Sequence, residues 1–172
     1  MKRISGILLA GVLALPGAYA VTAVSAEPEL TPSLIMNQIK VLTASERGGD
    51  ELYFDISIYK ANQPTQYARI PARPMHWPSQ YLDKVQQVSL WSQPLKAGQA
   101  VTLIVSLIES DGSVVNPDDL IGSVRLALKN DKGALQTSWS MPNSLAGVSQ
   151  DAMQTFEMQG QGKYQVSFSL KK

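Results

Sequence analysis

Residues 101–108 read Val-Thr-Leu-Ile-Val-Ser-Leu-Ile, an almost continuous run of aliphatic and β-branched side chains. β-Branched residues favour strands, because their side chains pack well on a pleated surface. A strand with hardly any polar positions is typical of the centre of a sheet that is covered on both sides. We therefore predict a central strand at 101–108, with both of its faces covered.

Other segments alternate between apolar and polar side chains. Glu51–Tyr59 reads Glu-Leu-Tyr-Phe-Asp-Ile-Ser-Ile-Tyr and Tyr164–Leu170 reads Tyr-Gln-Val-Ser-Phe-Ser-Leu, a pattern that predicts strands with one face in the core. Further candidate strands are 34–42, 85–91, 120–128, 134–139 and 154–158. Eight short strands divided by turn residues indicate an all-β fold, an antiparallel sandwich or barrel.

Two further expectations follow from this pattern. The connection at 71–84, which contains Pro71, Pro74 and Pro78, is expected to carry one turn of helix around Ser79–Lys84. The side chains that we expect to be buried are Leu103, Val105, Leu107, Ile121, Phe168 and Leu170.

The N-terminus has the pattern of a cleavable secretory signal peptide over residues 1–26. Lys2 and Arg3 precede an uncharged stretch at 4–15, and the small-x-small sites Ala18-Tyr-Ala20 and Val24-Ser-Ala26 follow it. The apolar stretch is shorter than the roughly 20 residues that span a bilayer. We therefore expect a periplasmic or secreted protein, with a linker at 27–33, a single domain at 34–172 and no transmembrane segment after processing.

Composition narrows the classes of partner and of chemistry. Without Lys2 and Arg3 the chain carries 13 basic against 14 acidic residues, which disfavours nucleic acid and anionic membranes as partners on charge alone. The absence of cysteine excludes disulfides, thiolate metal sites and a Cys nucleophile. No hydrolase or phosphate-loop motif is present, and the single histidine, His76, lies in a proline-rich stretch. We expect no enzymatic activity.

Acidic residues concentrate in two predicted loops, 44–51 and 109–119. Carboxylates crowded at loop ends repel one another, and a hard cation relieves that repulsion. Calcium accepts six to eight oxygen ligands in irregular geometry, so paired acidic loops suit it. Acidic turns also occur without any ion, because Asp and Asn favour turn conformations.

At these loops the chain resembles a C2 domain. The stretch Val105-Ser-Leu-Ile-Glu109-Ser-Asp111 followed by Asp119-Leu-Ile-Gly122 is similar to the family's strand ending in Asp-x-Asp, its loop and its Asp-Phe-Ile-Gly. Upstream, Gly48-Gly-Asp-Glu-Leu-Tyr-Phe-Asp-Ile56 resembles the Gly-x-Ser-Asp-Pro-Tyr-Val-x-Val segment. The resemblance covers about 40 residues and implies an antiparallel eight-stranded β-sandwich.

The resemblance also implies a set of calcium ligands: Asp50 from the first loop, and Glu109, Asp111 and Asp119 from the third. This chain departs from the family's pattern at several places. The first loop-one aspartate would fall at Ala44, where only Glu46 is near enough to replace it, and two extra residues separate Asp111 from Asp119. A set altered in this way implies calcium binding that is weak or absent, and many members of this broad fold bind partners without calcium.

The sequence thus predicts an exported, non-enzymatic binding module of the bacterial envelope. Its contact surface would be the 44–51 and 109–119 loops, with a weakly held Ca²⁺, and its partner a membrane surface, a glycan or a protein. Two alternatives remain open. One is an enzyme or enzyme inhibitor with its site on the 60–84 connection, and the other is an assembly subunit that pairs through a sheet edge.

Overall fold

The fold is seen in a computed structural model that describes residues 28–111, 117–142 and 151–172. The predicted signal peptide, 1–26, lies outside these residues. The described strands are β1 (Ser33–Thr43), β2 (Glu51–Lys60), β3 (Gln66–Ile70), β4 (Trp77–Pro78), β5 (Gln86–Ser92), β6 (Ala100–Glu109), β7 (Asp119–Asp131), β8 (Ala134–Ser140), β9 (Met153–Gln159) and β10 (Lys163–Lys171).

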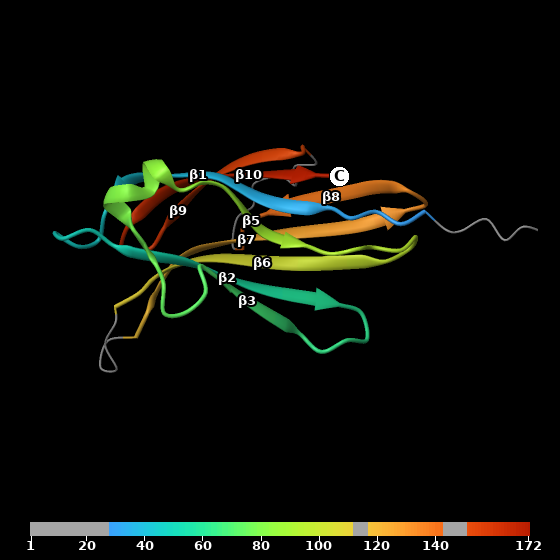
Figure 1. The fold of residues 1–172 in the computed structure, drawn as a ribbon, viewed down its shortest axis with the longest axis horizontal. Helices are drawn as coiled ribbons and strands as arrows, with labels where there is room; N and C mark the ends of the chain where they lie inside the picture. Colours follow the sequence, from blue (N-terminus) through green and yellow to red (C-terminus); the bar gives the residue numbers. More distant parts are fainter. Residues whose placement is uncertain (1–27, 112–116, 143–150) are drawn as a thin grey trace, which may run out of the picture.

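These strands form two antiparallel sheets that face each other (Figure 1). The small sheet has the order β5-β1-β10-β9, and the large sheet has the order β3-β2-β6-β7-β8 with β4 paired to β2. The predicted all-β, antiparallel sandwich is confirmed. Each of the eight predicted segments forms a strand, and the 3₁₀ helix η1 occupies Ser79–Lys84 as predicted.

The structure adds two strands, β3 and β4, within the connection at 60–84. β3 lies at the edge of the large sheet, where only β2 pairs with it. Its sequence, Gln-Tyr-Ala-Arg-Ile, contains no fully buried side chain, so it lacks the apolar alternation by which the other strands were recognised.

The core lies between the two sheets. Aromatic rings from both sheets meet in it: Trp139 stacks on Phe168 at 5.9 Å between centroids, and Phe54 meets Phe168 edge-on at 6.0 Å. Five of the six side chains predicted to be buried are buried. Leu170 is the exception: it is partly buried and packs against the core.

β6 is central, but the prediction that both its faces are covered is wrong. Leu103, Val105 and Leu107 are buried, whereas Thr102, Ile104, Ser106 and Ile108 on the opposite face are only partly buried. In a two-layer sandwich each sheet has one face toward the other sheet and one toward solvent. The run of aliphatic residues could not distinguish this half-covered strand from a fully covered one.

The segment before β1, which the sequence assigns to a linker, is attached to the sandwich. Leu30 forms an antiparallel bridge with Leu95, and the carbonyl of Pro28 accepts a hydrogen bond from Asn130 Nδ2 at 2.9 Å. Asn130 is fully buried, and its amide also donates to Leu95 O and accepts from Gly133 N. The described start of the domain is thereby held against the β7–β8 turn.

Candidate cation-binding site between two acidic loops

The register of β2 and β6 brings the two acidic loops to one end of the sandwich. Leu52 near the start of β2 pairs with Glu109 at the end of β6, and Ser110 N donates to Glu51 O at 2.8 Å. The loop before β2 and the loop after β6 must therefore lie side by side. Figure 1 shows both at the left end of the molecule.

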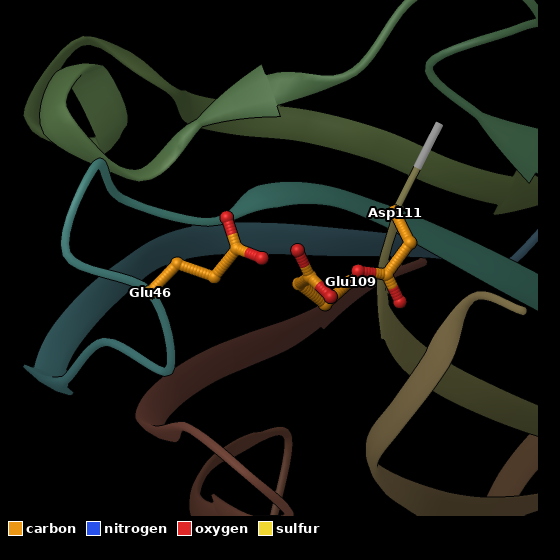
Figure 2. A group of neighbouring side chains, drawn as sticks. All are labelled: Glu46, Glu109 and Asp111. Carbon is orange, nitrogen blue, oxygen red and sulfur yellow. The ribbon is translucent and has the colours of Figure 1, made fainter. Parts of the chain in front are cut away.

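Three carboxylates meet there, from Glu46, Glu109 and Asp111 (Figure 2). One oxygen of each lies within 4.8 Å of the other two. Glu46 comes from the loop before β2, while Glu109 and Asp111 come from the end of β6 and the loop after it. Carboxylate oxygens at this spacing, without a cation among them, repel one another.

Glu109 occupies the centre of the group and is 4% exposed. Burial raises the pKa of Glu109 to about 7, because a buried carboxylate is costly to ionise. Neighbouring negative charges raise it further, in decreasing order: Asp111, Glu46, Asp50 and Asp119. No donor among the described residues reaches the Glu109 carboxylate, and Asp111 Oδ2 is also buried without a hydrogen-bond partner there.

Asp50 is fully buried but has a different environment. Its carboxylate accepts hydrogen bonds from the backbone N–H groups of Ser45 and Glu46 at 3.0 Å, and from the hydroxyl of Tyr164. Burial acts to raise the pKa of Asp50, but the donors from Tyr164, Ser45 and Glu46 together outweigh it and lower that pKa. Asp50 is thus an anion that holds the loop carrying Glu46.

The approach of Tyr164 to this loop depends on a glycine in the turn between β9 and β10. A Cβ placed on Gly162 would lie 2.8 Å from the Tyr164 ring and 3.0 Å from Asp50 Oδ2. A side chain at position 162 would therefore push the tyrosine away from Asp50. Burial, and then the hydrogen bond to Asp50, raise the pKa of Tyr164, so its hydroxyl remains a donor.

Asp118 and Asp119 follow the part of the second loop at 112–116, which lies outside the described residues. Asp118 accepts hydrogen bonds from Tyr53 OH at 2.7 Å and from Asp111 N at 3.3 Å. Arg69 stacks over the Tyr53 ring, with 3.4 Å from its guanidinium carbon to the ring centroid. Asp119 pairs with Glu109 in the sheet, and its carboxylate accepts a hydrogen bond from Gln161 Nε2 at 2.5 Å.

Of the four residues implied as ligands, the structure brings Glu109 and Asp111 together, with Asp119 opposite Glu109 in the ladder. Asp50 faces its own loop and Tyr164 instead. Glu46, the nearest replacement for the missing loop-one aspartate, is the third member of the carboxylate group. The supporting residues Tyr53, Arg69 and Tyr164 were not found from the sequence, because their partners lie far along the chain.

The alternative site on the 60–84 connection depended on His76. The His76 ring lies 3.6 Å from a carboxylate oxygen of Glu51, and both side chains are partly exposed.

No helix in the described part of the chain is long and apolar enough to cross a membrane. Compared with profiles of known protein families and with curated protein sequences, the chain has no match.

Proposed function

We propose that this protein is an exported, non-enzymatic binding module, similar to a C2 domain, that holds a divalent cation weakly at Glu46, Glu109 and Asp111. The observation that carries the proposal is the convergence of these three carboxylates within 4.8 Å, one of them buried and without a donor among the described residues. Calcium is the ion that suits them best, because all the ligand atoms are oxygens on two separate loops.

The cation would act as a link between the loops and a partner. Three carboxylates supply fewer oxygens than calcium accepts, unless all of them are bidentate. The remaining positions can take water, or an oxygen of a phosphate, a carboxylate or a hydroxyl on the partner. A membrane surface, a glycan or a protein could each supply such an oxygen. Outside the cytoplasm an affinity of about 10⁻⁴–10⁻³ M would be sufficient, as in other extracellular modules.

A calcium titration of the melting temperature tests the ion site. Added Ca²⁺ should raise the melting temperature, by the equivalent of about 1.4 kcal/mol at a concentration tenfold above Kd. Mg²⁺ should have a smaller effect, because it requires near-octahedral geometry and loses its water reluctantly. Asp111→Asn should remove most of the calcium effect and leave the calcium-free protein at least as stable, since one repelling charge has gone.

Asp83→Asn is the matched control, because Asp83 is an exposed carboxylate on η1 and is not a member of the carboxylate group. It should retain the full calcium effect. A melting curve that millimolar calcium leaves unchanged would rule out the ion. A calcium effect that Asp111→Asn leaves intact would place the ion elsewhere.

A further inference from the structure

A carboxylate outside the group of Glu46, Glu109 and Asp111 joins the two described ends of the second acidic loop. Asp118 Oδ1 accepts hydrogen bonds from the backbone N–H of Asp111 at 3.3 Å and from the hydroxyl of Ser110 at 3.5 Å. Asp118 therefore contacts the backbone of a proposed ligand. Both distances are long for hydrogen bonds, so this contact depends on what holds Asp118 from its other side.

The other oxygen of Asp118 is held by side chains of the large sheet. Tyr53 OH donates to Asp118 Oδ2 at 2.7 Å, and a guanidinium nitrogen of Arg69 lies 4.0 Å from the same oxygen. Tyr53 is 3% exposed and the side chain of Arg69 is 14% exposed. A hydrogen bond from a buried hydroxyl to a carboxylate is short and strong, because the acceptor is charged and little water competes for it.

Strand register explains why these two side chains meet. Arg69 on β3 is the cross-strand partner of Asp55 on β2, and Tyr53 lies two positions before Asp55 on the same face. Arg69 is thus the diagonal neighbour of Tyr53, which lets its guanidinium stack over the tyrosine ring. The edge strand β3 thereby supplies a positive charge beside Asp118.

Asp118 and Asp111 consequently have different surroundings. Both oxygens of Asp118 accept hydrogen bonds, whereas Asp111 Oδ2 is buried without a hydrogen-bond partner among the described residues. Burial, and then the hydrogen bond to Asp118, raise the pKa of Tyr53, so its hydroxyl remains a donor. Asp118 is engaged by protein donors, and Asp111 is the carboxylate with an oxygen left for a cation.

Holding Asp111 in place matters because the carboxylates beside it repel it when no cation is bound. If the end of the loop were free, Asp111 would move away from Glu109, and a cation would have to bring the two together again. That ordering would reduce the affinity, whereas a site that is already assembled avoids the cost.

We propose that Asp118 is a positioning residue of the cation site. Held by Tyr53 and Arg69, it fixes the backbone of Asp111 and so keeps the Asp111 carboxylate beside Glu109 before a cation binds. Asp118 is not itself a ligand, and it acts on the cation through Asp111. This inference rests on the proposed function, since it requires a cation at the carboxylate group.

Titration of the mature protein with Tb³⁺, followed by its luminescence and by competition with Ca²⁺, tests the proposal. Tb³⁺ takes oxygen ligands as calcium does, and its higher charge should keep binding by weakened variants measurable. Asp118→Ala should weaken binding about tenfold, and Tyr53→Phe, which removes only the hydroxyl donor, severalfold. In a protein that already carries Asp111→Ala, adding Asp118→Ala should have no further effect, because the ligand that it positions is gone.

Asp55→Asn is the matched control, because Asp55 is an exposed carboxylate paired with Arg69 in the ladder and is not a member of the carboxylate group. It should bind Tb³⁺ as the unchanged protein does. If Asp55→Asn weakens binding as much as Asp118→Ala, negative charge near the site is the cause, and the proposal fails. It also fails if Asp118→Ala weakens binding equally with and without Asp111→Ala, since Asp118 would then act independently of Asp111.

Two further outcomes separate this inference from the proposed function. If Asp118→Ala and Tyr53→Phe lower the melting temperature in EDTA but leave the Kd for Tb³⁺ unchanged, their role is structural only. The inference is then wrong, while the cation site stands. If the unchanged protein binds neither Tb³⁺ nor Ca²⁺, the proposed function fails and this inference fails with it.

Discussion

At the scale of single residues, the site contrasts two buried carboxylates with opposite pKa shifts. Asp50 has backbone and hydroxyl donors around it, so its pKa is lowered despite burial. Glu109 is almost equally buried, has no donor among the described residues, and is surrounded by other acids, so its pKa rises to about 7. The two carboxylates therefore differ in their number of hydrogen-bond donors and not in burial. The donors stabilise the charge of Asp50, whereas the charge of Glu109 would be stabilised by a bound cation.

The raised pKa of Glu109 predicts how the stability of the calcium-free protein depends on pH. Its ordinary pKa is 4.5, so between pH 4.5 and about 7 the folded state binds more protons at Glu109 than the unfolded state does. The stability conferred by this group is therefore complete below pH 4.5 and is lost as the pH rises to about 7. The lowered pKa of Asp50 acts in the opposite sense: its contribution to stability is present above the ordinary pKa of 3.8 and is lost as the pH falls below that value.

Glu109→Gln should reduce the fall in stability between pH 4.5 and 7, and should stabilise the calcium-free protein at pH 8 by roughly 1–3 kcal/mol. Urea unfolding in EDTA at several pH values measures this. Asp83→Asn, an exposed substitution, should leave the pH profile unchanged. If Glu109→Gln shows the same pH profile as the unchanged protein, Glu109 does not carry the repulsion described above.

At the scale of elements, strand register determines where the acids lie. β2 and β6 pair without a register shift from Leu52↔Glu109 to Lys60↔Val101. The acidic loops therefore meet at one end of this ladder, and Lys60 lies at the other. β6 also shows how one strand serves two environments, with Leu103 in the core and Ile104 on the outer face.

Two neighbouring substitutions on β6 test this one-sided burial. Leu103→Ala should cost about 2–5 kcal/mol, because it leaves a cavity between the sheets. Ile104→Ala removes a similar volume from the partly buried outer face, so we expect less than half of that loss. Guanidinium unfolding of the two variants measures the difference. Equal losses would mean that another layer covers the outer face in solution.

At the scale of the whole molecule, charge is separated along the sandwich. Seven of the 14 acidic residues lie in or beside the two loops at one end: Glu46, Asp50, Glu51, Glu109, Asp111, Asp118 and Asp119. Lys60, Lys96, Lys129 and Lys132 lie at or near the turns of the opposite end. Arg47 and Lys163 also lie at the acidic end, and Asp131 lies at the opposite end, so the separation of charge is partial.

The prediction at this scale concerns processing. If residues 1–26 are a signal peptide, the full chain expressed in a bacterium with the general secretion machinery should lose them. Mass spectrometry of the exported protein should then show an N-terminus at Glu27, or at Val21 if the earlier site is used. A protein that begins at Met1 and remains in the inner-membrane fraction would contradict the prediction.

The sequence by itself determined the all-β class and the positions of eight strands. These properties depend on local alternation and on turn residues, which can be recognised without knowing what packs against them. It also brought Glu109 and Asp111 into one candidate site and named Glu46 as the replacement for a missing ligand. β3 was not found, because an exposed edge strand needs little apolar alternation.

Only the tertiary structure decided the surroundings of each acid. Asp50 and Tyr164 are 114 residues apart, and nothing in the local sequence of either indicates that their side chains meet. That contact and the backbone donors of Ser45 and Glu46 engage the Asp50 carboxylate, while the Glu46 carboxylate lies beside that of Glu109.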